Sequence, residues 1–170
     1  MEGNGGSPIY VDGPWSHRPV TANGTRFHIA EAGEGPLILL LHGFPQFWWT
    51  WRAQLASLSA AGFRAVAADL RGYGGSDKPP RGYDLITAAS DAAGMVRALG
   101  EANAVVVGHD WGGLVAWTMA AYFPKVVRRL AVSSNRLRGS ADSLVTCPTA
   151  KTVVSVSLAN RISRAAHSRT

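Results

Sequence analysis

The stretch Ala104-Val-Val-Val-Gly-His-Asp-Trp-Gly-Gly113 decides the fold predicted for this 170-residue chain. Its apolar beginning predicts a buried strand over 104–108, and the segment from Trp111 to Phe123 predicts a helix that starts at once. Between the two stands Asp110, with glycines on both sides. This order is typical of a sharp strand-to-helix turn that lifts one side chain above a sheet. The glycines are needed because a Cβ at their positions would collide with the neighbouring strand or helix.

Strand and helix patterns also alternate ahead of this turn. The continuous apolar run Leu37–Leu41 predicts a strand that is buried on both faces of a parallel sheet. Asn23-Gly24 predicts a tight hairpin between two extended stretches. The remaining expected elements are helices over 51–61 and 85–99 and buried strands over 63–70 and 126–132. We therefore expect an α/β fold in which a mostly parallel sheet carries helices on both faces.

The overall composition excludes several other classes of protein. Hydrophobic residues make up 46% of the chain and charged residues 16%, which is unlike a disordered or collagen-like sequence. The single cysteine, Cys147, excludes an internal disulfide. The longest apolar run is far shorter than the roughly 20 residues that cross a bilayer, and the N-terminus lacks the basic start of a secretory signal. We therefore expect a cytoplasmic protein with no membrane span.

The charge divides the chain into unlike parts. The formal net charge is +6, but residues 1–124 hold 8 basic and 10 acidic side chains, whereas residues 125–170 hold 9 and 1. We predict an N-terminal extension over 1–17, a partial α/β domain over 18–132, and a divergent, basic, Ser/Thr/Arg-rich tail over 133–170. Because that tail has no aromatic residue and a single glycine, we expect it to be poorly ordered.

Ligands of such sheets bind beyond the carboxyl ends of the strands, which is where three turns of this chain lie. The turns span 42–45, 69–76 and 108–113. At the apex of the third turn, the Asp110 carboxylate is anionic at neutral pH, because the ordinary pKa of aspartate is about 3.9. It can attack an electrophilic carbon and form an alkyl ester, which water must then hydrolyse through an oxyanion. The alternative interpretation is that Asp110 only caps the following helix.

Two backbone N–H groups are candidates for stabilising that oxyanion. Phe44 follows the Leu37–Leu41 strand, and Trp111 begins a helix, so its N–H has no partner within that helix. His42 and His109 lie beside tight turns. We expect each of these imidazoles to hydrogen-bond neighbouring backbone rather than to take part in catalysis.

The other polar residues near these turns indicate no cofactor. The two histidines have no third His, Cys or carboxylate at a ligand spacing, so no metal site is predicted. The Gly72-Tyr-Gly-Gly75 segment lacks the third glycine of a dinucleotide fingerprint and is not followed at once by a helix. We expect Asp69 and Arg71 to support this loop through ion pairs and hydrogen bonds.

Three motifs, His42-Gly-Phe-Pro45, Asp69-Leu-Arg-Gly-Tyr-Gly-Gly-Ser-Asp-Lys-Pro79 and Gly108-His-Asp-Trp-Gly-Gly113, resemble those of epoxide hydrolases in the α/β-hydrolase superfamily. The resemblance covers about residues 18–132. It implies that Asp110 is the alkylated nucleophile and that the backbone N–H groups of Phe44 and Trp111 form the oxyanion hole. It implies no organic cofactor and no metal, and a small, apolar, electrophilic substrate such as an epoxide. Haloalkane and haloacetate dehalogenases share the Asp nucleophile and are the alternative, with an organohalide as substrate.

The family also has parts that follow the fourth buried strand. They are a helical cap with two tyrosines that protonate the epoxide oxygen, and late strands with an acid and a histidine that activates water. After Asp110, the only carboxylate side chain in this sequence is Asp142 and the only histidine is His167. Neither residue stands in a motif that matches the family's. We therefore expect an α/β-hydrolase fold that lacks the cap and the last strands, and a catalytically incomplete enzyme that stops at the ester.

A non-catalytic fragment or binding module that uses the basic tail is the alternative outside catalysis. The nine cations are spread out, with no interleaved aromatic residues on which bases could stack, so we expect no nucleic-acid partner. Salt-dependent binding to generic DNA that is lost on deletion of residues 133–170 would favour this alternative.

Overall fold

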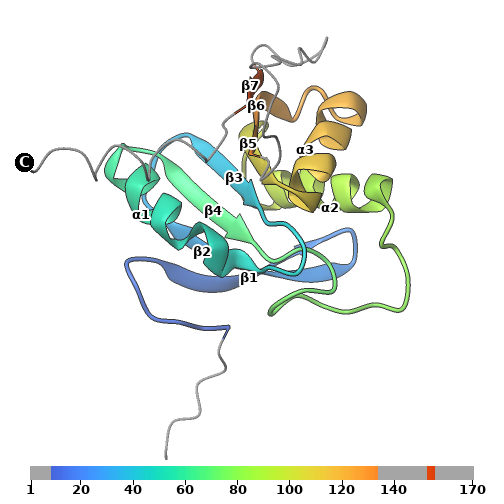
Figure 1. Ribbon diagram of the computed structural model, residues 1–170, viewed down its shortest axis with the longest axis horizontal. Coiled ribbons are helices and arrows are strands. Elements are labelled where there is room, and N and C mark those ends of the chain that lie inside the picture. The colour runs from blue at the N-terminus through green and yellow to red at the C-terminus, as the bar shows by residue number, and fades with distance from the viewer. Residues whose placement is uncertain (1–8, 134–152, 156–170) are drawn as a thin grey trace, which may run out of the picture.

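The computed structural model describes residues 9–133 and 153–155, which form one sheet with helices on both sides (Figure 1). The strands are β1 Ser16–Ala22, β2 Thr25–Ala32, β3 Leu37–Leu41, β4 Arg64–Ala68, β5 Ala104–His109, β6 Val127–Ser133 and β7 Val153–Ser155. The helices are the 3-10 helix Trp48–Trp51 and the α-helices α1 Arg52–Ala60, α2 Leu85–Ala98 and α3 Trp111–Tyr122. No helix in the described part of the chain is both long and apolar enough to span a membrane.

The sheet is mostly parallel, with strand order β1-β2-β4-β3-β5-β6-β7. β1 and β2 form the antiparallel hairpin predicted at Asn23-Gly24, and β2 runs antiparallel to β4. All the remaining pairs of adjacent strands are parallel. The predicted α/β class is therefore confirmed. β7, which lies within the predicted tail, adds a short parallel strand beside β6, and the other residues of 134–170 lie outside the described residues.

The apolar run of β3 is explained by a core on each face of the sheet. Leu37, Leu39 and Leu41 pack into the larger core, which includes buried residues of α2 and α3. Ile38 and Leu40 point to the opposite face and pack with Leu55 of α1. Each residue of β3 is therefore buried, as expected for a central strand with helices on both sides. In Figure 1, α1 lies on one side of the sheet and α2 and α3 lie on the other.

The strands on the far side of β3 are less buried than the sequence predicts. Val105 and Val107 of β5 are half-buried, and in β6 both Arg128 and Arg129 are exposed, so the expectation of a fully buried strand over 126–132 is wrong. The physical reason is the position of α1, which contacts β2 and β4. Among the described residues, no helix covers β5 and β6 on that face, whereas α3 packs against them on the other.

Candidate active site

The turn between β5 and α3 has the sharp geometry that its glycines predict. Asp110 has φ 51° and ψ −116°, a backbone conformation that residues other than glycine rarely adopt. A Cβ at Gly108 would meet the carbonyl oxygen of Gly112, and one at Gly112 would meet the carbonyl oxygen of Leu41. The helix therefore starts in direct contact with β3 and β5, and the side chain at the apex stands clear of the sheet.

The Asp110 carboxylate is exposed and makes no capping hydrogen bond to α3, which contradicts the helix-cap alternative. Instead, its Oδ2 accepts a hydrogen bond from the backbone N–H of Phe44 at 3.1 Å. Hydrogen bonds from the backbone N–H groups of Phe44 and Trp111 lower the pKa of Asp110 below its ordinary value of 3.8. The carboxylate is therefore ionised at neutral pH and held by two backbone donors.

Sheet pairing brings the three predicted site residues together. β3 and β5 are parallel neighbours in which Leu41 lies opposite Gly108, so the turns that follow these strands leave the sheet side by side. Phe44 comes from the first turn, and Asp110 and Trp111 come from the second. The donors and the carboxylate thus meet at the carboxyl edge of the sheet, where α/β folds bind their ligands.

His42 and His109 make the backbone contacts that were predicted for them. His42 is fully buried, and its ring joins Nδ1 to the carbonyl of Gly43 at 2.9 Å and Nε2 to the N–H of Leu70 at 3.0 Å. His109 joins its Nδ1 to the carbonyl of Ser133 at 3.0 Å. In the described ranges, 9–133 and 153–155, no group of three or more His, Cys, Asp or Glu side chains could hold a metal ion.

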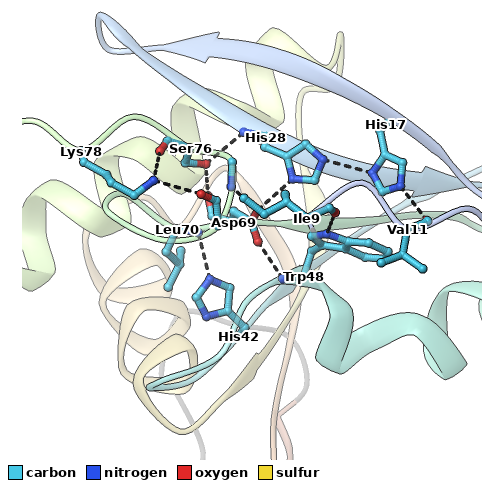
Figure 2. Close-up of polar contacts among 12 residues, drawn as sticks. Ile9, Val11, His17, His28, His42, Trp48, Asp69, Leu70, Ser76 and Lys78 are labelled. Carbon is cyan, nitrogen blue, oxygen red and sulfur yellow. Dashed lines mark hydrogen bonds and ion pairs between the residues drawn. The ribbon is translucent and has the colours of Figure 1, made fainter. Parts of the chain in front are cut away.

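Asp69 supports the loops around the site from a fully buried position (Figure 2). It accepts hydrogen bonds from the Trp48 N–H at 2.7 Å, the Gly75 N–H at 2.9 Å and His28 Nδ1 at 2.8 Å. Burial by itself would raise the pKa of Asp69, but these hydrogen bonds outweigh it and lower that pKa. The predicted supporting role of Asp69 is confirmed. Arg71 instead forms its ion pair with Asp91 of α2, at 2.7 Å.

A chain of two histidines behind Asp69 was not predicted. His17 Nδ1 lies 3.0 Å from His28 Nε2, and His17 Nε2 lies 3.0 Å from the carbonyl of Val11 (Figure 2). Both ends of this chain are oxygen acceptors, the Asp69 carboxylate and the Val11 carbonyl. His17, His28 and Asp69 are far apart in sequence, and no local motif connects them.

Comparison with known proteins agrees with this architecture. Residues 36–150 match the family model described as alpha/beta hydrolase fold, which is more than half of the chain. The chain belongs to the α/β-hydrolase fold family. The match includes all three site residues, Phe44, Asp110 and Trp111.

Several proteins similar to this α/β-hydrolase carry epoxide hydrolase names. Over 116 residues it is 44% identical to epoxide hydrolase 3 of Siraitia grosvenorii, an alignment that covers 67% of this chain and 37% of the relative. It is 44% identical over 110 residues to bifunctional epoxide hydrolase 2 of Sus scrofa, covering 64% of this chain and 20% of that one. The chain thus spans well under half the length of these relatives.

Solved structures show the same likeness. An epoxide hydrolase from an endophytic Streptomyces superposes with a TM-score of 0.71 and 44% sequence identity. That superposition covers 75% of this chain and 39% of the Streptomyces chain. The chain is therefore an epoxide hydrolase-like α/β-hydrolase over its N-terminal part.

Proposed function

We propose that the Asp110 carboxylate is the nucleophile of an epoxide hydrolase reaction. The observation that carries this proposal is the hydrogen bond from the Phe44 N–H to Oδ2, which orients the ionised carboxylate at the exposed apex of the turn. Because Oδ2 is held by backbone, Oδ1 is the oxygen that attacks. The epoxide hydrolase names of the relatives favour an epoxide over an organohalide as the electrophile.

The first step is displacement at an epoxide carbon. Oδ1 of Asp110 forms a bond to that carbon while the carbon–oxygen bond of the strained ring breaks. The ring oxygen leaves as an alkoxide and takes a proton from solvent water, so the products are a hydroxyalkyl ester of Asp110 and a hydroxide ion. This step needs no general base because the nucleophile is already an anion at neutral pH.

The second step is hydrolysis of this ester, in which water attacks the carboxyl carbon and an oxyanion develops on Oδ2. The N–H groups of Phe44 and Trp111 are placed to stabilise that charge. Water is a weak nucleophile and needs a general base. Among the described residues, His17, His28, His42 and His109 hydrogen-bond elsewhere, and none of them bonds to Asp110. Because no histidine in the described part of the chain bonds to Asp110, we propose that the ester accumulates.

Intact-mass measurement after incubation with a reactive epoxide such as styrene oxide tests this proposal. We expect a mass increase of one epoxide, located on Asp110 by peptide mapping and absent in the Asp110→Asn variant. Asp84→Asn, the same exchange at a fully exposed carboxylate, is the matched control and keeps the adduct. Steady diol production would show that hydrolysis is complete after all, and the absence of both adduct and diol would reject Asp110 as nucleophile.

A further inference from the structure

The buried imidazole of His42 has no role in the chemistry described above, yet it contacts the segment that carries Phe44. His42 directly follows β3 and is fully buried. Its two ring nitrogens face two different loops of the site, and Nδ1 meets the carbonyl of Gly43. Nε2 meets the N–H of Leu70, the contact drawn in Figure 2. The ring of Tyr73 lies edge-on to it, with the ring centroids 5.2 Å apart.

These two contacts determine where the proton of the ring is. A backbone N–H can only donate, so Nε2 must be the unprotonated nitrogen that accepts from Leu70. A carbonyl can only accept, so Nδ1 must carry the proton and donate it to Gly43. A second ring proton would place two donors head to head. Burial, the largest influence, also lowers the pKa of His42, although its bond to Gly43 and the nearby Asp69 charge raise it in part.

The carbonyl that His42 holds belongs to the same peptide unit as the Phe44 N–H. A trans peptide is planar, and its C=O and N–H point in opposite directions. The carbonyl of Gly43 accepts from His42 Nδ1 at 2.9 Å and from the Gln46 N–H at 3.0 Å. The N–H on the other side of the plane therefore points at Asp110, where it makes its 3.1 Å bond.

A glycine at position 43 makes this restraint necessary. Rotation of the Gly43–Phe44 peptide meets little steric resistance at glycine, and it would turn the carbonyl oxygen toward the Asp110 carboxylate. Glycine itself is required there, because a Cβ would lie 2.7 Å from Cβ of Asp110 and 2.9 Å from its Oδ2. The orientation of the peptide therefore depends on the hydrogen bonds to its carbonyl, and the peptide lies close to the nucleophile.

We propose that His42, as a neutral imidazole protonated at Nδ1, is a positioning residue that holds the Gly43–Phe44 peptide with its N–H toward Asp110. This inference rests on the proposed function, since it assigns His42 the task of keeping one oxyanion donor in place. His42 acts through the peptide and does not touch the substrate or the reacting atoms.

Two substitutions separate the two contacts of the ring. In His42→Asn, the side-chain NH2 falls near the position of Nδ1 and can still donate to the Gly43 carbonyl, while the acceptor for Leu70 is lost. In His42→Gln, the side-chain oxygen reaches the position of Nε2 and can still accept from Leu70, while the donor to Gly43 is lost. A merely structural role predicts similar losses of stability and no selective effect on Asp110.

Two quantities are measured: the pKa of Asp110, and the rate at which its ester is hydrolysed through the oxyanion. In His42→Gln, loss of the Phe44 N–H raises the pKa of Asp110, so the acid limb of the alkylation rate moves to higher pH. Hydroxide-promoted release of the ester, which passes through the oxyanion, slows by about tenfold or more. In His42→Asn, the acid dissociation constant of Asp110 and the rate of ester release both stay within about threefold of their wild-type values. Equal behaviour of the two variants, or a larger effect of Asn, would overturn the proposal.

Two measurements keep this test independent of the proposed function and of the folding of the variants. Carbon-13 NMR titration of the Asp110 carboxyl needs no reaction: an upward pKa shift confined to His42→Gln supports the inference even if the wild-type chain forms no adduct. Nitrogen-15 NMR of wild-type His42 needs no variant. A proton on Nδ1 and none on Nε2 across pH 5–8 supports the proposal, and a protonated Nε2 overturns it.

Discussion

Replacement of Asp69 by asparagine is expected to remove a large part of the stability of this fold. The side chain is fully buried and accepts from three donors, the N–H groups of Trp48 and Gly75 and Nδ1 of His28. Asparagine has one acceptor oxygen, and its NH2 group would face at least one of these donors. A buried donor left without its acceptor costs about 1–3 kcal/mol, and more where the lost acceptor is charged, out of a typical total of about 5–15 kcal/mol.

Urea denaturation followed by tryptophan fluorescence measures this loss, because Trp48 is bonded to Asp69 and is itself fully buried. We expect a much lower midpoint with an unchanged slope. Asp77→Asn is the matched control in the same loop: the Asp77 side chain is 41% exposed, its ion pair with Arg26 is long, at 3.4 Å, and asparagine keeps an oxygen that can accept from the Arg26 N–H. It should cost less than about 1 kcal/mol.

The pH dependence of the same measurement provides a second check. The pKa of Asp69 is lower in the folded state than its ordinary value of 3.8, so its contribution is fully present above that value. The contribution is lost as pH falls through the folded-state pKa, and the wild-type and Asp69→Asn free energies of unfolding should converge in acid. A loss below about 1 kcal/mol at pH 7, or a difference that does not shrink in acid, would refute the reasoning.

Three further predictions concern the turn and the second helix. The acid limb of Asp110 alkylation should lie below pH 3.8, because backbone hydrogen bonds lower its pKa; a limb at or above that pH in a rate profile would contradict this. Gly112→Ala should prevent the tight start of α3, since its Cβ would meet the Leu41 carbonyl, and circular dichroism should show misfolding or a strongly lowered melting temperature. Asp84→Ala should lower the midpoint of urea titrations, because Asp84 caps α2 through the Thr87 N–H at 2.9 Å.

The sequence alone determined the fold class and the turn that carries the candidate nucleophile. Both rest on local patterns: alternating strands and helices, and glycines at positions where only a hydrogen fits. The spacing around Asp110 predicted a strained turn because steric collisions between adjacent backbone segments depend on residues close in sequence. Placement of Phe44 next to Asp110 also followed, since the ends of neighbouring parallel strands lie at one edge of a sheet.

Only the tertiary structure decided which polar groups meet. The hydrogen-bonded chain of His17, His28 and Asp69 joins residues separated by 11 and 41 positions, and the link from His42 to Leu70 spans 28. The partial exposure of β5 and β6 likewise depends on where α1 packs and not on the apolar pattern of the strands. Hydrogen bonds and burial of this kind are set by the approach of distant segments in three dimensions, and no local sequence pattern specifies them.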